Sequence, residues 1–594
     1  MIAPKQKEPY FLATTALEKF WDTTKPIIFL GEWCRLYERR QFWQNIEHKL
    51  MTAPYQSQKD AEEAFFFVNK VYEHVLPILA SALNDIHGVN YTVRAWRILI
   101  GPWLQYYLSA IYDRYTHIKQ AIALYPNFTT ITLAPNLFVV PQDTLESVSL
   151  LSDDFYNLQI LTKILATFGN TYPERTIYRA DNFLYKNLTK LSLHRKIIGD
   201  ITQFYEKICS SCFSVIHLKN TYFPKKIELN LAVRNFGQLL PMWEKAFTNV
   251  SSAYDADKRK LLQSLNFGAG EFEKCVAKML FSDIPKCFVE QFTPAYLTKK
   301  PPVAILSANA WYFDEKFKHW AAVAAEQGTL LLGAQHGGSY GGLALMMPEV
   351  HETTIVDRYY SWGWEKPNSL AMVVAMPATK LIGRKKIGAD NRKNDVLWAA
   401  TFYGRYLVEF PYLSTRDYAY CLWQKRFAES LTKNKLEQIR FRPHFASFGT
   451  GGVERLLAFA PNIVVESWDT PFQKSLINCR LYVCDHLSTT FAEALSANKP
   501  TILFWDPELN KLRPEAQFYY DALRKVGILF DTPEAAAFAV NNIYDDVETW
   551  WNQSVRQEAV KLFCHQFART SPDAVKLWDQ ELKSIVSSAP CSSL

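Results

Sequence analysis

A chain of 594 residues has room for two or more domains, and its content of 48% hydrophobic and 15% aromatic residues excludes a disordered or fibrous protein. The 66 basic and 59 acidic residues give a formal net charge of +7 without long runs of one sign, so no nucleic-acid partner is expected. No window approaches the roughly 18 apolar residues of a membrane span, and the first residues do not resemble a signal peptide, so a cytoplasmic protein is expected.

Ten cysteines are scattered, and the closest pair, Cys209 and Cys212, lacks the second pair or nearby histidines that a zinc site needs. Asp255 and Asp257 have the spacing of a metal-binding Asp-x-Asp motif, but they lie in a charged helical run without a flanking apolar strand. We therefore expect reduced, mostly buried thiols, a solvated acidic face and no metal site.

An apolar run at 25–31 predicts a buried strand that ends at a glycine, and Glu32 follows it directly. Ligands bind at the carboxyl ends of strands in open α/β sheets, so Glu32 is a candidate general base. A surface or capping glutamate explains the same position equally well.

From residue 59 to about 125, apolar side chains recur every three or four residues, which predicts long helices that form a helical insertion. A turn between two of them carries His87, and the next helix carries Arg94 and Arg97 among tryptophans. Aromatic rings stack on sugars and guanidinium groups pair with anions, so these residues are candidates for acceptor binding. The helical spacing favours the other interpretation, which is core aromatics beside solvated charges.

Regular strands return at 302–307 and 329–334, with a helix between them. The second strand leads to His336, and four of the next six residues are glycines. Such a turn exposes the backbone and one imidazole at the carboxyl edge of a sheet. We expect His336 to act as a general base or as a proton donor to an anion; the alternative is a histidine bonded within its own turn.

Residues 383–394 are polar and poor in apolar side chains, which is typical of a linker. Six apolar runs follow, each succeeded by a helical pattern, and this alternation predicts a doubly wound parallel sheet. The predicted strands span 396–401, 438–442, 463–466, 481–484, 501–505 and 527–530. The last helical run, 547–568, is long enough to cross back to the first domain.

Two loops of this second half are suited to bind an anion. The second strand ends in Arg442 and His444 around a proline, and both side chains can donate to phosphate. The fourth strand leads to a hydroxyl cluster, 488–490, at the start of a helix, where unpaired N–H groups also converge. A capping box of Thr490 and Glu493 explains this second loop by itself. Together the two loops predict a monophosphate or diphosphate ligand.

Three motifs, 335–337, 442–444 and 485–490 followed by Glu493, resemble those of the GT-B transferases of bacterial surface polymers. These include the CDP-glycerol glycerophosphotransferases of teichoic acid synthesis and the Kdo transferases of capsule synthesis. The segments 11–17, 30–34, 87–88 and 101–103 resemble a family of predicted transferases from O-antigen gene clusters, a likeness that spans most of the chain.

The resemblance implies an α/β protein of the GT-B fold, with two Rossmann-like domains that face a cleft. Residues 1–390 would form the acceptor domain, with a helical insertion at about 50–300, and residues 391–594 the donor domain. The usual proline after the second-loop histidine is replaced by Phe445, which leaves the conformation of that loop open. Gly338 and Ser339 replace the Thr-Pro of the glycerophosphotransferases, which favours a sugar over a glycerol phosphate donor.

By the same resemblance, His336 matches a histidine implicated in catalysis or acceptor binding, and Glu493 falls where GT-B enzymes often hold the nucleotide ribose. The implied donor-binding residues are Arg442, His444, Asp485, Ser488, Thr489, Thr490 and Glu493. His336 or Glu32 would be the catalytic base, and His87, Arg94 and Arg97 would contact the acceptor.

The expected activity is metal-independent glycosyl transfer, with inversion, from a nucleotide sugar to a bacterial surface glycan such as lipopolysaccharide O-antigen or capsule. The nucleotide sugar is a co-substrate and no cofactor is expected; a CMP-linked donor of Kdo or a similar nonulosonate is one candidate. The acceptor would be lipid-linked or an oligosaccharide, at the inner face of the cytoplasmic membrane, with peripheral association through residues near 384–393. The alternatives are a CDP-polyol phosphotransferase and a non-catalytic sugar- or nucleotide-binding assembly protein.

Overall fold

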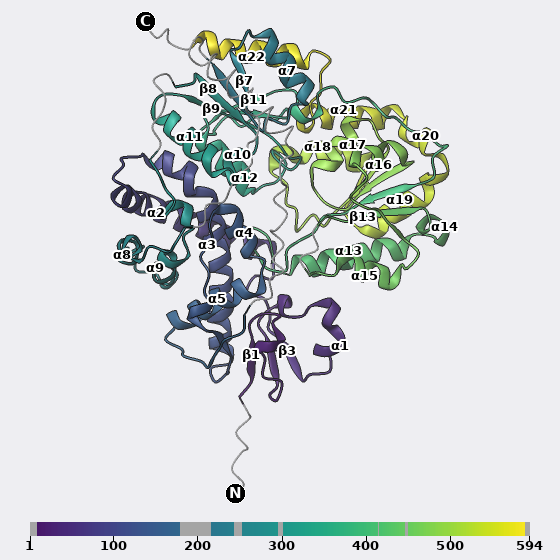
Figure 1. Ribbon diagram of the computed structural model, residues 1–594. Coiled ribbons are helices and arrows are strands. Elements are labelled where there is room, and N and C mark those ends of the chain that lie inside the picture. Colours follow the sequence, from purple (N-terminus) through teal and green to yellow (C-terminus); the bar gives the residue numbers. More distant parts are fainter. Residues whose placement is uncertain are drawn as a thin grey trace, which may run out of the picture.

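The computed structural model describes residues 9–178, 215–242, 252–294, 301–413, 415–445 and 449–588 (Figure 1). It consists of a small N-terminal sheet, a block of long helices, a two-stranded sheet of β4 (Thr132–Leu133) and β5 (Glu174–Arg175), and two six-stranded parallel sheets. The close pair Cys209 and Cys212 lies outside the described residues. The cysteines within them are free thiols, four of them buried.

The N-terminal segment forms a separate parallel sheet of three short strands, which lies near the N-terminus in Figure 1. Its strands are β1 (Phe11–Ala13), β2 (Ile27–Phe29) and β3 (His48–Leu50). The expected strand at 25–31 therefore exists as β2, but it does not belong to the sheet that leads to His336. Each of these strands has three residues, so the pattern alone could not assign them to a sheet.

Long helices pack against this sheet and against the first large sheet. They are α2 (Gln58–His87), α3 (Val93–Leu124), α4 (Thr144–Leu150), α5 (Asp154–Thr167), α8 (Ala256–Gln263) and α9 (Glu271–Asp283). Helix α2 begins with a capping box between Ser57 and Asp60 and ends at Gly88, whose φ of +62° is the left-handed conformation that favours glycine. Trp96 and Trp103 of α3 are fully buried, so its aromatics are core residues.

The first large sheet has the order β11-β10-β9-β8-β6-β7, with all strands parallel. Its strands are β6 (Ile216–Lys219), β7 (Leu239–Pro241), β8 (Ala304–Ser307), β9 (Leu330–Ala334), β10 (Arg358–Ser361) and β11 (Met372–Ala375). Its main helices are α7 (Lys225–Arg234), α10 (Ala310–Phe313), α11 (Glu315–Glu326) and α12 (Met347–Ile355). The expected insertion at 50–300 is too long, because β6 and β7 fall inside that range and belong to the sheet.

The second large sheet confirms all six strands expected from the sequence, in the parallel order β14-β13-β12-β15-β16-β17. They are β12 (Val396–Ala399), β13 (Ile439–Arg442), β14 (Val464–Val465), β15 (Leu481–Cys484), β16 (Thr501–Phe504) and β17 (Leu529–Phe530). The helices between them are α13 (Arg416–Ser430), α15 (Gly452–Phe459), α16 (Phe472–Asn478), α17 (Thr489–Ser496) and α18 (Pro514–Lys525), and α19 (Pro533–Ile543) follows the last strand. In chain order this is the 3-2-1-4-5-6 arrangement of a Rossmann sheet, whose direction switches between β12 and β15.

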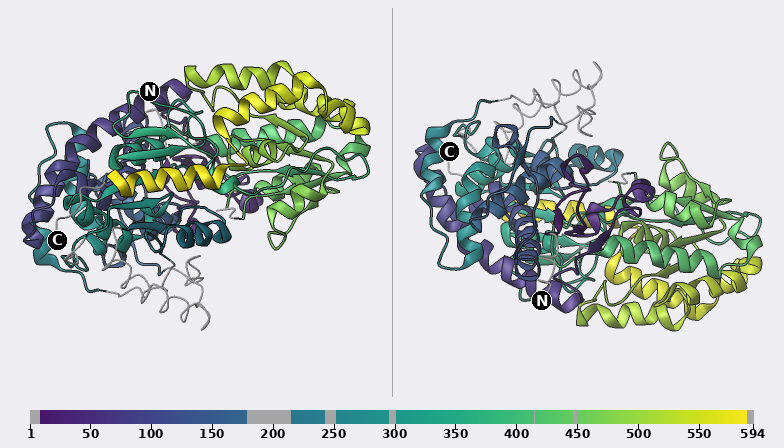
Figure 2. Two further views of the ribbon diagram at one scale, coloured as in Figure 1. Left: turned by 90° about the horizontal axis from the view of Figure 1, so that it is seen from above. Right: turned by 90° about the horizontal axis from the view of Figure 1, so that it is seen from below.

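The chain returns to the first domain at its end, but through a later helix than expected. The run 547–568 forms α20 (Val547–Trp551) and α21 (Ser554–Phe567), and α21 packs on α17 and α18 of the second domain. Helix α22 (Ala574–Ser588), yellow in Figures 1 and 2, lies on the first large sheet. Trp578 of α22 is buried there, and its indole N–H donates to the Pro377 carbonyl at 2.9 Å.

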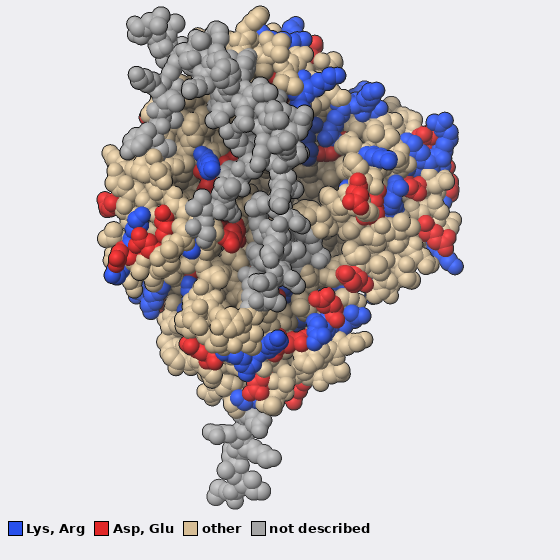
Figure 3. All heavy atoms as spheres, viewed as in Figure 1, with Lys and Arg blue, Asp and Glu red and all other residues tan. Residues whose placement is uncertain are grey.

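The two large sheets meet at their carboxyl ends, since the loop after β9 contacts the loop after β15. Two Rossmann-like domains in this arrangement constitute the GT-B fold. Within the described part of the chain, no helix has the length and apolar character to cross a membrane. On the face shown in Figure 3, acidic and basic side chains are intermingled.

Candidate functional site

The loop that carries His336 is fixed by the buried residue before it. Gln335 follows β9 directly and is fully buried. Its side-chain amide donates to the Gly337 carbonyl at 2.6 Å, and its oxygen accepts from the Trp362 N–H at 2.7 Å and the Trp364 indole at 2.8 Å. A buried amide with three partners has one orientation, so the turn presents His336 in a defined position at the sheet edge.

His336 is held by a carboxylate and a phenol. Its Nε2 lies 3.0 Å from Oε1 of Glu352, on α12, and 2.8 Å from the Tyr340 hydroxyl. Tyr340 donates its own proton to the same Glu352 oxygen at 2.9 Å, and burial raises the pKa of Tyr340 well above its usual range. With both neighbours acting as acceptors toward the ring, Nε2 carries the proton and Nδ1 keeps a lone pair. This tautomer can take a proton at Nδ1.

On the second domain, Ser488 starts α17. Its hydroxyl accepts from the Thr490 N–H at 3.4 Å and lies 3.0 Å from the Thr490 hydroxyl. The capping box of Thr490 and Glu493 is therefore wrong, because Ser488 is the N-cap and Glu493 binds other partners. Hydroxyls and N–H groups thus lie at the positive end of a helix dipole, which is where an anion is stabilised.

The two loops touch each other. The Gly338 N–H donates to the Thr489 hydroxyl at 3.1 Å, and the Ser339 hydroxyl donates to the Leu487 carbonyl at 3.0 Å. A Cβ on Gly338 would lie 2.4 Å from the Ser488 carbonyl oxygen, so a side chain does not fit there. The glycine-rich turn therefore allows the backbones of the two domains to approach, and it brings His336 and the 488–490 turn into one site.

Glu493 lies behind this turn and is surrounded by cations. Its Oε1 pairs with Lys380 at 2.9 Å, and its Oε2 pairs with Arg384 at 2.7 Å and accepts from Gln473 at 2.8 Å. Glu493 is buried, whereas the side chains of Lys380 and Arg384 are 29% and 22% exposed. Two cations against one carboxylate leave a surplus positive charge next to α17. This pairing occupies both oxygens that the sequence analysis assigned to a ribose.

Tyr222 links the two halves of the site and was missed by the sequence analysis. It follows β6 with φ of +62°, a left-handed conformation that strains a bulky L-residue. Its ring stacks on His336 with centroids 6.1 Å apart, and the Lys380 ammonium lies 5.6 Å from the ring centre. Asn309 donates to its hydroxyl at 3.1 Å. Tyr222 therefore bridges the imidazole and the cation; no motif in the sequence marks it.

Arg442 does not have the free guanidinium that phosphate binding would use. It is buried and donates to Glu466 at 2.7 Å and to the Thr470 carbonyl at 2.9 Å. The His444 ring packs on Phe402, with centroids 4.4 Å apart. Because Phe402 belongs to the loop after β12, and β12 lies between β13 and β15, that loop intervenes between His444 and the 488–490 turn. The expectation that Arg442 and the 488–490 turn bind the same phosphate is therefore wrong.

Asp485 is buried inside the second domain, where its carboxylate accepts hydrogen bonds, so it does not face the nucleotide sugar. Its Oδ1 accepts from the Tyr420 hydroxyl at 2.6 Å and from His486 at 2.9 Å. Its Oδ2 accepts from the Trp398 indole and from the Gln424 amide, each at 2.9 Å. Four donors saturate this carboxylate, so it orders the loop after β15 instead of meeting a ligand.

Glu32 lies on the small N-terminal sheet, so it does not share the sheet edge of His336. It pairs with Arg35 at 2.6 Å and lines a small gap of about 30 Å³ against Asp417 and Arg455 of the second domain. Burial raises the pKa of Asp417 to about 7. These contacts place Glu32 at the junction of the small sheet and the second domain, and none of them involves His336.

The three residues expected to bind the acceptor hold helices together. His87 lies 2.9 Å from the Phe288 carbonyl and stacks on Phe292, and burial lowers its pKa. Arg94 donates to the Ile355 carbonyl and pairs with Asp357 at 2.9 Å, and Arg97 pairs with Glu73 at 2.6 Å. The alternative interpretation, core aromatics beside paired charges, describes these residues.

The Asp-x-Asp spacing has a local explanation too. Asp255 caps α8 by accepting from the Asp257 and Lys258 N–H groups, and Asp257 pairs on the surface with Lys260 at 2.7 Å. In the described ranges, no three histidine, cysteine, aspartate or glutamate side chains are grouped so that they could hold a metal ion.

One protein family and several solved structures match the chain. Residues 10–582 match the family described as LIC12162 family transferase. No curated protein matches the chain. The structure is similar to that of MnaA from S. aureus with UDP (13% identity, TM-score 0.35, 64% of this chain and 99% of that one).

It is also similar to the structure of WaaG, a glycosyltransferase involved in lipopolysaccharide biosynthesis (12% identity, TM-score 0.29, 62% of this chain and 99% of that one). A third similar structure is a UDP-forming trehalose-phosphate synthase from Burkholderia vietnamiensis (9% identity, TM-score 0.33, 64% of this chain and 99% of that one). Likenesses this weak carry no argument about this chain.

Proposed function

Because the chain belongs to the LIC12162 family of transferases, we propose that it is a glycosyltransferase that uses a nucleotide sugar. One observation carries the proposal: the turn of His336 from the first domain contacts the 488–490 turn of the second, at 3.1 Å between Gly338 and Thr489. A proton acceptor and an anion site then face one another across the domain boundary. Transfer of a sugar from a phosphate to a hydroxyl needs both groups.

In this reaction Nδ1 of His336 takes the proton of the acceptor hydroxyl while that oxygen attacks the anomeric carbon of the donor. Glu352 and Tyr340 keep the proton on Nε2 and stabilise the imidazolium that forms. The bond from the anomeric carbon to the phosphate oxygen breaks, and the departing nucleotide keeps its electron pair. The α17 N-terminus, its hydroxyls, Lys380 and Arg384 stabilise that negative charge. Direct attack inverts the anomeric centre.

For the donor we propose a CMP-linked sugar such as Kdo or another nonulosonate, and for the acceptor a bacterial surface glycan on a lipid carrier or a free oligosaccharide. The resemblance of the 335–337 and 485–490 motifs to surface-polymer transferases supports this choice. Gly338 and Ser339, where the glycerophosphotransferases have Thr-Pro, also support it. The proposed place of action is the inner face of the cytoplasmic membrane.

A thermal-shift series with CMP, CDP, UDP and GDP tests the nucleotide site. A ligand at about 100 times its Kd stabilises the folded state by about 2.7 kcal/mol, which raises Tm. We expect the largest rise with CMP, and its loss in Lys380→Met, because that variant removes one of the two cations beside α17. Lys385→Met, an exposed lysine on the same segment, is the matched control and should keep the rise. Absence of a rise with every nucleotide would contradict the proposal.

The phosphotransferase alternative uses the same loops, so it is separated by products. Incubation with a CMP-sugar and with CDP-glycerol, followed by mass analysis of the acceptor, shows whether a sugar or a polyol phosphate is added. A non-catalytic binding protein would bind nucleotide but would turn over neither donor.

A further inference from the structure

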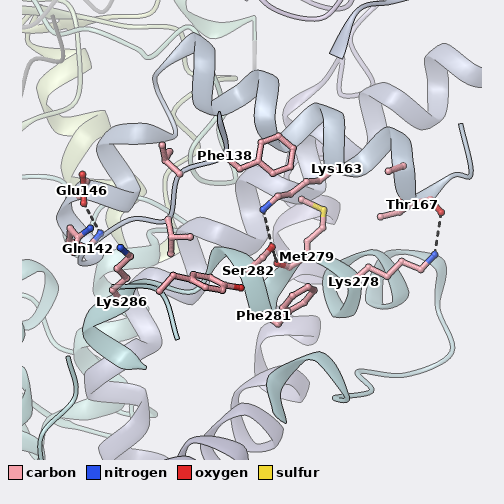
Figure 4. A pocket seen from close by; sticks show the side chains of 14 residues that line it. Phe138, Gln142, Glu146, Lys163, Thr167, Lys278, Met279, Phe281, Ser282 and Lys286 are labelled. Atoms are coloured by element: carbon pink, nitrogen blue, oxygen red, sulfur yellow. Dashed lines mark hydrogen bonds between the residues drawn. The ribbon is translucent and has the colours of Figure 1, made fainter. Parts of the chain in front are cut away.

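The helical block contains a cavity of about 850 Å³ between α5, α9 and the segment 138–146 (Figure 4). Its cationic groups do not converge, because Lys278 and Lys286 lie at opposite ends of the cavity and Lys163 is neutralised by Asp283. The side chains drawn in Figure 4 therefore do not define a ligand. The outward face of α7, on the first large sheet, is more specific in its chemistry.

Helix α7, near the top of Figure 1, exposes apolar side chains where a surface helix is ordinarily polar. Leu231 packs in the core of the first large sheet, so residues two positions away on either side, Leu229 and Val233, point to solvent. These two are 44% and 74% exposed, and Phe236, in the turn after the helix, is 84% exposed. Three large apolar side chains thus form an exposed stripe along α7, and a stripe of this kind marks a contact surface.

The same face of α7 is basic. Lys225 and Lys226 are exposed and form no ion pair within the described part of the chain, and Arg234 is exposed at the other end of the helix. The one acid of α7, Glu228, is buried. Asp579 of α22 lies near Arg234, but it already pairs with a lysine of its own helix at 2.8 Å. The apolar stripe is therefore flanked by a surplus of positive charge.

The helix also begins beside the site described above. The turn between β6 and α7 carries Tyr222, whose ring stacks on His336 with centroids 6.1 Å apart. The first turn of α7 therefore lies at the carboxyl edge of the sheet, where His336 lies too. A surface that holds α7 would bring a molecule anchored in that surface close to the imidazole.

We propose that α7 docks on an anionic membrane surface, with the apolar stripe among the upper acyl chains and the three cations against lipid phosphates. Lysine and arginine stems are long enough to keep their charges at the headgroups while the stripe is buried. A nucleic acid would pair with the cations but would leave the stripe in water. The use of this contact to present a lipid-linked acceptor rests on the proposed function, whereas the membrane binding does not.

The segment near 384–393, where the sequence suggested membrane contact, is less suited to this role. Arg384 pairs with Glu493 at 2.7 Å, and Arg392 pairs with Asp390 at 2.9 Å. This segment is described throughout and exposes no large apolar side chain. It has charges that are already paired and no carbon surface to insert, whereas α7 has exposed apolar side chains beside unpaired lysines.

Sedimentation of the full chain with vesicles of phosphatidylcholine, with and without phosphatidylglycerol, tests the proposal. We expect binding to the vesicles that contain phosphatidylglycerol. Lys225→Ala with Lys226→Ala should lower the partition coefficient by about fivefold for each cation removed. Lys433→Ala with Lys525→Ala removes two exposed lysines of the second domain and should leave it unchanged. Equal binding to both kinds of vesicle, or an unchanged partition coefficient in the α7 lysine variant, would overturn the proposal.

A second pair of variants tests the apolar stripe. Val233→Ser with Phe236→Ser should lower the partition coefficient at least about tenfold, since two inserted side chains lose their apolar surface. Val555→Ser with Phe538→Ser changes a valine and a phenylalanine that are also exposed, on α21 and α19, and should bind vesicles as the unaltered protein does. All four positions are exposed, so each variant should keep the Tm of the unaltered protein. Unchanged vesicle binding in the α7 pair would contradict the proposal.

Light scattering of the same proteins without vesicles separates a membrane surface from an interface between copies of the chain. Self-association that Val233→Ser with Phe236→Ser abolishes would overturn the proposal, whereas an identical molar mass in both proteins supports it. Transfer to a water-soluble acceptor should be the same in all these variants, because none of them changes His336 or the 488–490 turn. Failure of membrane binding is therefore distinguishable from failure of the proposed transfer.

Discussion

The chemistry of each loop depends on single side chains, and the residues that pair with these side chains lie far away in the sequence. Arg442 and Lys380 are both basic residues near the second sheet, yet Arg442 is neutralised by Glu466 whereas Lys380 shares Glu493 with Arg384. The sequence pattern identified Arg442 because it follows a strand. It could not show that an acid from the neighbouring strand lies 2.7 Å away. For the same reason Tyr222 and Glu352 carried no signal in the sequence.

Glu409, in the loop after β12, provides a residue-scale prediction about pH. Its Oε2 has no hydrogen-bond partner among the described residues, and burial raises its pKa from an ordinary 4.5 to about 7. Between these two pH values the folded protein binds more protons than the unfolded chain, so stability falls as pH rises from about 4.5 to 7. Glu409→Gln removes the charge, so at pH 7 we expect it to be about 2–3 kcal/mol more stable than the unaltered protein.

The measurement is the urea midpoint of the second-domain transition at pH 5 and pH 7. The difference in urea midpoint between Glu409→Gln and the unaltered protein should increase as pH rises. Asp417, whose pKa is also raised by burial, contributes a slope of the same sign in both proteins. Glu508→Gln, at an exposed position, serves as the control. An equal difference in urea midpoint at both pH values would show that Glu409 does not titrate in this range.

At the scale of elements, strands were predictable where strand and helix alternate regularly. All six strands of the second sheet were identified, because each is an apolar run followed by a helical pattern. Strands β6 and β7 were hidden inside a long helical region, and β6 contains His217 and Lys219, which interrupt an apolar run. The loop after β9 was correctly placed at a sheet edge. Its contact with the second domain depends on how the two domains pack, which the sequence pattern does not reveal.

The same loop gives an element-scale prediction. Gly338→Ala places a Cβ 2.4 Å from the Ser488 carbonyl oxygen, so one of the two turns must move. Overpacking of this kind costs about 1–3 kcal/mol, and it separates His336 from the 488–490 turn. We expect a lower Tm and a loss of kcat/KM of at least about tenfold, because small displacements of reacting groups are costly to catalysis.

Gly452→Ala is the matched control, since its Cβ would meet nothing closer than 4.0 Å and Gly452 lies at the start of α15. It should retain both Tm and activity. Full activity of Gly338→Ala would mean that the two turns need not touch during the reaction.

At the scale of the whole molecule, the chain crosses between the two large domains twice. The segment 376–395 runs from β11 to β12 and supplies Lys380 and Arg384, and the chain returns through α21 and α22. Gly363, with φ of +130°, lets the first domain approach α21, where a Cβ would lie 2.3 Å from the His565 carbonyl oxygen. The two domains are therefore joined by backbone contacts at both crossings, and the site between them is built from both.

We propose that the two facing turns have separate roles, with nucleotide binding at α17 and proton transfer at His336. One measurement separates these roles: the nucleotide Kd and the transfer rate for Ser488→Ala and His336→Ala, with the same CMP-sugar. We expect Ser488→Ala to weaken nucleotide binding by about tenfold. His336→Ala should keep that Kd and lose about 10²- to 10⁴-fold in kcat. Unchanged transfer by His336→Ala, or unchanged nucleotide affinity in Ser488→Ala, would contradict it.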